Sequence, residues 1–108
     1  TPEYNYSVPG VLKNAIDAAT RPPGDNPFNG KAGAIMGASI GMLGTARAQY
    51  HLRQTCVLLN LRLLNQPEIM VTFAEKKFDQ DGRLIDEIAR GKVRELIEAL
   101  VNLIQKLK

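Results

Sequence analysis

The sequence predicts an α/β fold, with a parallel sheet covered by helices on both faces, from three observations. Residues 31–39 form a short apolar run with the composition of a strand that is buried on both faces, and residues 61–65 suggest a second strand. A stretch with helical periodicity lies between them, and strand–helix–strand implies a right-handed parallel crossover. Helical periodicity also precedes the first run and follows the second. The expected order is therefore helix, strand, helix, strand, helix.

The first helix is expected to follow a loop over residues 1–6. Ser7 is a candidate N-cap, and Pro9 falls where the first helical turn tolerates proline. Apolar residues then recur on one helical face, at Val11, Leu12, Ala15, Ile16 and Ala19. The segment 21–30, "RPPGDNPFNG", ends this helix because prolines and glycines favour a loop.

The middle of the chain predicts a strand, a glycine loop and a helix. "KAGAIMGAS", residues 31–39, reads as the first strand, although alanine and glycine are poor strand formers. Glycines at 37, 41 and 44 mark a loop, and a helix is expected from about Gly44 to Asn60. "LRLLN" predicts the second strand, and an extended pattern resumes at residues 68–72, after Pro67.

The last element is a helix that Asp86 is expected to cap, after a polar segment with room for one helical turn. Its apolar positions recur in steps of three and four, at Ile88, Val93, Leu96, Ile97, Leu100, Val101, Ile104 and Leu107. Two parallel strands alone do not close a stable sheet with helices on both faces. The pattern is therefore typical of the rear portion of a doubly wound domain.

Length and composition predict one globular domain over residues 1–108. The chain has a mass of 11.9 kDa, a net charge of +3 and a pI of 9.2. The charges are interleaved, so no basic stripe predicts a nucleic-acid partner. No apolar run approaches the roughly 20 residues that span a bilayer, and no signal peptide opens the chain. Because the first residue is threonine, we expect that residues upstream have been lost or removed.

Single reactive residues exclude several kinds of site. Cys56 is the only cysteine, which excludes an internal disulfide and favours a reducing, cytoplasmic location. Its apolar neighbours predict a buried, inert thiol. His51 is the only histidine, so neither a zinc site nor a Ser-His-Asp triad is expected. "FDQDGRLIDE" resembles a calcium loop, but its spacing around Gly82 fails the ligand pattern.

Two segments are candidates for ligand contact. The glycine loop "MGASIGMLGTA", residues 36–46, follows a predicted strand and precedes a helix, where open α/β sheets bind ligands. The alternative is a turn that simply needs glycine. In "TPEYNYS" the two tyrosines flank Asn5, and aromatic faces with amide edges suit a planar ligand such as a flavin or a base. The alternative there is a polar tail.

Taken together, three segments resemble the NADPH-dependent FMN reductases, a family that includes chromate and quinone reductases. The segments are "TPEYNYSVPGVLKNAID", "GKAGAIMGASIGMLGTARAQYHLRQT" and "NQPEIMV". The resemblance implies a flavodoxin-like fold, of which this chain is expected to be the C-terminal part. The phosphate loop of the family, which follows the first strand, has no counterpart here. We therefore expect the isolated chain to bind FMN weakly or not at all.

The resemblance also implies a site. Pro2, Glu3, Tyr4 and Asn5 match the family's PEYN loop, which lies against the flavin ring, and Ser39 matches a further flavin contact. The implied cofactors are FMN and NADPH (or NADH), with no metal. No side chain is expected to act as a catalytic acid or base, because the flavin itself carries the hydride.

The implied activity is two-electron transfer from NAD(P)H through FMN to a quinone, a metal oxyanion or free flavin. The competing hypothesis is an inactive fragment or an interaction module, which would be colourless where a flavoprotein is yellow. The family commonly assembles as homodimers or tetramers. Arg47, Tyr50 and Glu68 are therefore expected near a subunit contact, since Arg47 and Tyr50 share a helix face.

Overall fold

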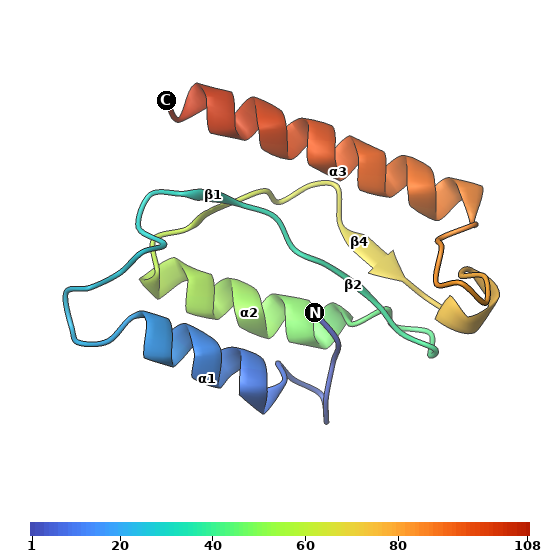
Figure 1. The fold of residues 1–108 in the computed structure, drawn as a ribbon, viewed down its shortest axis with the longest axis horizontal. Helices are drawn as coiled ribbons and strands as arrows, with labels where there is room; N and C mark the ends of the chain where they lie inside the picture. The colour runs from blue at the N-terminus through green and yellow to red at the C-terminus, as the bar shows by residue number, and fades with distance from the viewer.

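The computed structural model describes all 108 residues as three layers, with two short, two-stranded parallel sheets between helices (Figure 1). α1 (Gly10–Ala19) and α2 (Ala46–Leu58) lie on one side of the strands, and α3 (Glu87–Lys106) lies on the other. The strands are β1 (Ala32–Gly33), β2 (Met36–Ala38), β3 (Arg62–Leu63) and β4 (Ile69–Val71), and a 3₁₀ turn, η1, covers Ala74–Lys76. The predicted α/β class and the order of the elements are confirmed.

Each of the two predicted strand regions is interrupted. β1 pairs in parallel with β3, and β2 pairs in parallel with β4. The offset between paired residues rises from 30 in the first pair to 33 in the second, so the β3–β4 side carries three extra residues. Pro67 lies in that interruption, where a missing N–H costs no ladder hydrogen bond. The prediction of one continuous strand over residues 31–39 is therefore wrong, although both pieces run as expected.

The core lies between β4 and α3. Ile69, Val71, Ala89 and Leu96 form its buried cluster, and Leu96 is only 2% exposed. Asp86 caps α3 as predicted, since its carboxylate accepts a hydrogen bond from the Ala89 amide at 2.9 Å. Only 12 of the 108 residues are buried, so most of the apolar side chains keep part of their surface in solvent.

The first helix starts differently from the prediction. Pro9, not Ser7, occupies the position before α1, and no side chain caps that end. Ser7 cannot serve as the cap because its backbone pairs with Tyr4 and its hydroxyl lies 2.7 Å from Nδ1 of His51. No residue of α1 is buried. This helix therefore rests on the layer beneath it without contributing to the core.

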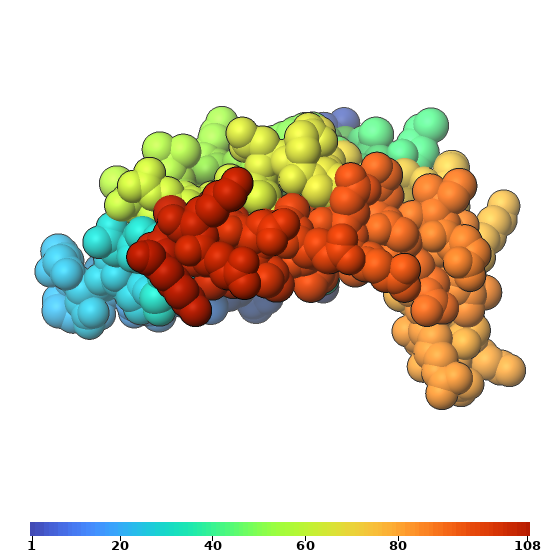
Figure 2. Space-filling view, turned by 90° about the horizontal axis from the view of Figure 1, so that it is seen from above, coloured from blue at the N-terminus to red at the C-terminus, as the bar shows by residue number.

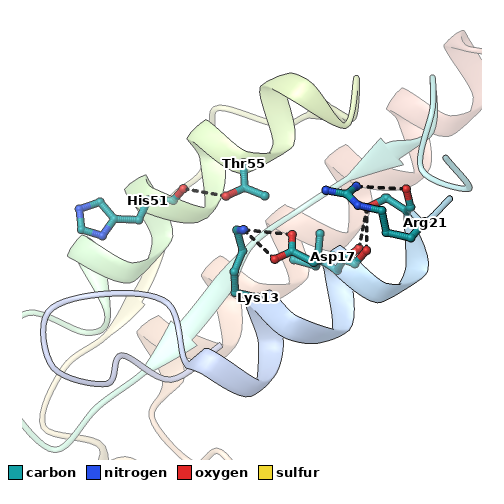
Figure 3. Close-up of polar contacts among 7 residues, drawn as sticks. Lys13, Asp17, Arg21, His51 and Thr55 are labelled. Atoms are coloured by element: carbon teal, nitrogen blue, oxygen red, sulfur yellow. Dashed lines mark hydrogen bonds and ion pairs between the residues drawn. The ribbon is translucent and has the colours of Figure 1, made fainter. Parts of the chain in front are cut away.

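The surface polar contacts are ordinary ones. Lys13 pairs with Asp17 along α1 at 2.9 Å, and the His51 ring points away from the other side chains drawn (Figure 3). The segment between η1 and α3 projects from one corner of the molecule (Figure 2). It closes on itself through a bridge between Phe78 and Leu84. None of the helices combines the length and the apolar character that crossing a membrane requires.

Candidate functional site

The candidate site lies where β2 and β4 end, because parallel strands bring the loops that follow them to one edge of the sheet. The Ser39 amide donates to the Val71 carbonyl at 2.9 Å, and the Phe73 amide donates to the Gly41 carbonyl at 2.9 Å. The glycine loop, residues 39–45, is thereby tied to the segment that follows β4. Open α/β sheets bind ligands at this edge.

A hydrogen bond joins the two ends of the glycine loop, whereas the backbone amides at its tip have no partner. Ser39 Oγ accepts a hydrogen bond from the Gly44 amide at 3.1 Å. Gly44 has φ +55°, and a Cβ there would lie 2.5 Å from the Met70 carbonyl carbon, so no other residue fits. At the tip, the amides of residues 40–43 donate to no acceptor in the chain. Four consecutive N–H groups therefore have no acceptor within the chain, and all four residues are exposed.

The N-terminal loop, residues 1–7, lies beside this edge. The Thr1 nitrogen donates to the Met36 carbonyl at 2.8 Å, and Tyr4 and Ser7 exchange backbone hydrogen bonds at 3.0 and 3.1 Å. The turn between them places Asn5 and Tyr6 at φ 49° and 76°. Non-glycine residues rarely adopt such angles, and they cluster at ligand sites. The side chains of Tyr4 and Asn5 are exposed and make no hydrogen bond within the chain.

Glu3 anchors the N-terminal loop to α2. One carboxylate oxygen accepts from the Ala48 amide at 3.0 Å, in the first turn of the helix, and the other accepts from Arg47 Nε at 2.7 Å. Thr45, which precedes the helix, makes no capping bond, so Glu3 caps this end from 45 residues away. The Arg47 guanidinium beside it holds the pKa of Glu3 below its ordinary value of 4.5.

Arg47 also lies over a tyrosine. Its guanidinium carbon is 3.5 Å from the centre of the Tyr6 ring, a cation–π arrangement. Three residues on, Tyr50 donates its hydroxyl to Glu68 at 2.7 Å, which raises the pKa of that phenol. Both tyrosine rings are at least half exposed. The sequence predicts that Arg47, Tyr50 and Glu68 lie near one another. It does not predict the contact between Arg47 and Tyr6, because the two residues are far apart in the chain.

Three hollows open on this half of the molecule. The polar hollow, of about 330 Å³, is lined by Glu3, Ser39, Gly41, Met42, Leu43, Thr45 and Arg47. The Tyr4 hollow, of about 570 Å³, is lined by Tyr4 and nine others, among them Thr1, Pro2 and Met36. The apolar hollow, of about 460 Å³, runs between α1 and the sheet and has twelve hydrophobic residues among its thirteen, including Leu12, Ile16 and Leu63.

The structure divides the predicted site residues between two of these hollows. Pro2 and Tyr4 line the Tyr4 hollow, whereas Glu3 and Ser39 line the polar hollow. Asn5 lines neither hollow and lies in the exposed turn between Tyr4 and Ser7. The two hollows share the N-terminal loop, because consecutive residues of that loop reach each of them. The chain contains no group of three or more histidine, cysteine or acidic side chains placed to hold a metal ion.

The fold is that of part of a doubly wound α/β domain, and the loops after two parallel strands meet at the edge where open sheets of this class bind ligands. The model of the NADPH-dependent FMN reductases matches residues 1–76, and the chain belongs to this family. The flavoenzyme NAD(P)H:(acceptor) oxidoreductase FerB from Paracoccus denitrificans superposes with a TM-score of 0.87 at 38% identity, over 98% of this chain and 58% of that one. The predicted flavodoxin-like fold is thereby confirmed.

Several curated relatives match the whole chain, and two of them illustrate the range. An NAD(P)H-dependent FMN reductase of Pseudomonas aeruginosa is 56% identical over 108 residues, and a quinone reductase of Escherichia coli is 46% identical over 109. The chain covers 58% and 57% of the lengths of these relatives. It therefore spans somewhat more than half of the proteins that it matches.

Proposed function

We propose that residues 1–108 belong to a flavodoxin-like FMN reductase domain that binds FMN at the edge formed by the glycine loop and the N-terminal loop. The observation that carries the proposal is the row of unpartnered amides at residues 40–43, beside exposed aromatic and amide side chains. A flavin ring offers carbonyl and imine acceptors and one N–H donor along its edge. Backbone amides supply donors for the acceptors, and Asn5 supplies both kinds of group.

In this proposal each predicted residue has a distinct task. Tyr4 and Pro2 present flat, apolar surface to the ring, and Asn5 hydrogen-bonds its edge. Ser39 fixes the base of the glycine loop, and Glu3 keeps the N-terminal loop against α2. The Arg47 charge is balanced by Glu3, so this edge suits the uncharged ring better than a phosphate.

When bound, FMN would supply the hydride chemistry, taking two electrons from NADPH or NADH and releasing them to an acceptor. The chain binds and orients the ring and leaves one face open for the exchange of substrates. Amides directed at the ring edge also stabilise negative charge that develops there, as an oxyanion hole does. None of these tasks requires a titrating side chain.

Flavin binding is testable by NMR titration of the ¹⁵N-labelled chain with FMN and with riboflavin, which lacks the phosphate. We expect both to bind weakly, with similar dissociation constants, because these residues contact the ring. If the chain made charge-assisted hydrogen bonds to the phosphate, FMN would bind more tightly than riboflavin by one or more powers of ten. Each power of ten in the dissociation constant corresponds to about 1.4 kcal/mol. The shifts should map to residues 2–5 and 39–43. Shifts elsewhere, or none at millimolar flavin, would rule out this site.

Two variants test the assigned contacts in the same titration. Asn5→Ala removes the edge contact and Ser39→Ala loosens the glycine loop, so each should weaken riboflavin binding several-fold. Asn14→Ala is the matched control, because Asn14 is an exposed amide on α1 outside the three hollows. Equal affinity in all four proteins would show that the loops do not carry the contact.

For the acceptor we propose a quinone, which the names of the Escherichia coli relative and of a 2-hydroxy-1,4-benzoquinone reductase of Burkholderia support. A metal oxyanion or free flavin are the other acceptors to compare. Consumption of NADPH by the FMN-supplemented chain, measured with benzoquinone, chromate and riboflavin in turn, ranks the three. An inactive fragment or interaction module would consume NADPH with none of them. We also propose a cytoplasmic location, since the buried Cys56 has no partner for oxidation.

We propose further that copies of the chain associate through the exposed face that carries Arg47, Tyr50 and Glu68. The Arg47–Tyr6 stack and the Tyr50–Glu68 bond place two half-exposed aromatic rings on this face. Tyrosine and arginine are the residues most enriched at the centres of interfaces. Light scattering at micromolar concentration should report a dimer or tetramer, and Tyr50→Glu should shift it towards the monomer. A monomeric unsubstituted chain would contradict the interface.

A further inference from the structure

A buried amide lies directly beneath the glycine loop. Gln49 of α2 is 1% exposed, and its Nε2 donates to Thr45 Oγ1 at 3.1 Å and to the Ile69 carbonyl at 2.8 Å. Its Oε1 is the one buried side-chain polar atom in the chain without a hydrogen-bond partner. An unpartnered buried oxygen is costly, so a methionine or leucine here would avoid a penalty that glutamine incurs. The two donated bonds must therefore do something that an apolar side chain cannot.

What these bonds hold is a strained residue. Thr45 has φ 71° and ψ 22°, the left-handed region that β-branched residues almost never adopt. It ends the glycine loop and precedes α2, and it is 1% exposed. A residue in this conformation persists only where its surroundings over-determine it. The amide of Gln49 supplies one such constraint, from the same helix one turn further on.

The other constraint is the missing side chain at position 37. A Cβ on Gly37 would lie 1.9 Å from Thr45 Oγ1 and 2.7 Å from the Thr1 carbonyl oxygen. Thr45 thus fills the space that β2 leaves empty, with Gln49 behind it. The hydroxyl is fixed between the strand and the helix, and β4 is bonded to the same amide through Ile69.

We infer that Gln49 is a positioning residue, which holds Thr45 left-handed and so keeps the glycine loop in the shape that presents amides 40–43 to the flavin. This inference rests on the proposed function. Without the two donated bonds, Thr45 relaxes towards an ordinary conformation. The Gly44 amide then leaves Ser39 Oγ, and the bonds from Phe73 and Ala74 to the loop carbonyls weaken with it.

Amide hydrogen exchange of the full 108-residue chain tests the inference apart from flavin binding. Gln49→Met keeps the length of the side chain and removes its donors. We expect the amides of Gly44, Ala46, Phe73 and Ala74 to exchange about tenfold faster or more, the equivalent of about 1.4 kcal/mol, while α3 amides such as Leu96 keep their rates. Gln54→Met is the matched control, an exposed glutamine on the same helix, and should change neither set.

Gln49→Glu gives a second test through pH. An ionised carboxylate has no donor for the Ile69 carbonyl, so the loop amides should exchange fast at neutral pH. Protonation of the introduced carboxyl creates one O–H donor, so the protection factors of the loop amides, which are corrected for the intrinsic slowing of exchange at low pH, should rise as the pH falls. A merely structural, space-filling role would predict no such pH dependence. Unchanged loop rates in both variants, or a rise in α3 rates equal to that in the loop, would overturn the inference.

Riboflavin binding by the same proteins separates this inference from the proposed function. If both are right, Gln49→Met weakens riboflavin binding about tenfold, and Gln54→Met leaves it unchanged. If the unsubstituted chain binds no flavin but the loop rates still respond, the flavin assignment fails while Gln49 still sets the loop. If flavin binds and the response is absent, the positioning role fails alone.

Discussion

The polar hollow lies where β2 and β4 end and the apolar hollow lies between α1 and the strands, and the two differ in how their walls are fixed. The polar hollow is bounded by bonded groups: Glu3 on two donors of α2, Ser39 on Gly44, and Thr45 on Gln49. The apolar hollow is bounded by α1, which has no buried residue and no capping side chain. The wall of the polar hollow is therefore fixed by hydrogen bonds and an ion pair, whereas the α1 wall of the apolar hollow is held by apolar contacts without a fixed direction.

This difference shows why volume alone does not locate a site. The apolar hollow is the larger of the two, but almost all of its lining is apolar, so it has little to orient a ligand. The polar hollow is lined by part of the segment with unpartnered amides and by Thr45, which has a positive φ. Asn5, Tyr6 and Phe73, in the segments on either side of the glycine loop, also have positive φ. Backbone strain of this kind is maintained only by surrounding structure and is typical of ligand sites. Changes at the polar edge should therefore cost more than changes of equal size at the apolar hollow.

The largest effect is expected from Gly44→Ala. The added Cβ would lie within 3 Å of three backbone atoms of Met70, at a positive φ, so the loop or β4 must move. We expect a loss of about 2–4 kcal/mol in the free energy of unfolding, measured by urea denaturation. Gly91→Ala is the control, because its Cβ meets nothing within 4 Å on α3 and should raise stability by about 0.5–1 kcal/mol. Equal effects would remove the contrast between loop and surface.

Glu3→Gln should have the next largest effect. The amide keeps one acceptor for Ala48 but loses the charged bond to Arg47. Because Arg47 is 34% exposed and solvent screens it, we expect about 1 kcal/mol, below the range for a buried charged bond. Glu95→Gln, which breaks the exposed pair with Lys92, should change stability by less than about 0.5 kcal/mol. A comparable loss at both sites would show that Glu3 is an ordinary surface charge.

An effect no larger than that of Glu3→Gln is expected at the apolar hollow, although the substitution there removes most of a side chain. Ile16→Ala removes a partly exposed side chain from α1, so we expect a loss of about 1 kcal/mol, against 2–5 kcal/mol for a fully buried isoleucine. Thermal unfolding followed by circular dichroism measures it. A loss near the upper figure would mean that α1 is as firmly packed as the loops at the polar edge, which would abolish the comparison.

The pH dependence gives the finest comparison. The pKa of Glu3 is lowered chiefly by its bond to Arg47, so the folded state holds this carboxylate ionised more strongly than the unfolded chain does. Its contribution to stability is therefore complete above about pH 4.5 and is lost as the pH falls through the lowered pKa. Urea midpoints from neutral to acid pH should converge for the unsubstituted chain and Glu3→Gln. Parallel curves would contradict the assignment.

Local pattern sufficed for the helices and for the position of the glycine loop. The steps of three and four in α3 and the Asp86 cap depend on neighbours in sequence, so they could be read directly. The strand interruption could not, because it follows from unequal lengths between paired residues of two distant segments. The prediction that Ser7 caps α1 was wrong for a similar reason. The backbone of Ser7 pairs with Tyr4, and its hydroxyl hydrogen-bonds to His51, which lies far away in the sequence.

At the candidate site, the residue types could be predicted from the sequence, whereas their contacts are known only from the structure. Gln49 is not singled out by the sequence analysis, because a glutamine in a helix is ordinarily exposed. Its signal was present, since it shares the inward face of α2 with Thr45 and Cys56, four residues before it and seven after it. The Glu3 cap had no local signal at all, because its partners lie 44 and 45 residues away.

That separation bears on the order of folding. A cap supplied by a neighbouring residue can form with its helix, but Glu3 meets the Ala48 amide only after α1 and β2 have brought residues 1–7 back to α2. Contacts of such high sequence separation form late, after the loop-closure entropy has been spent. We therefore expect the N-terminal loop to dock after the transition state for folding. Weakening this docking should therefore speed unfolding and leave the folding rate nearly unchanged, so we expect the N-terminal loop to dock late and to open early.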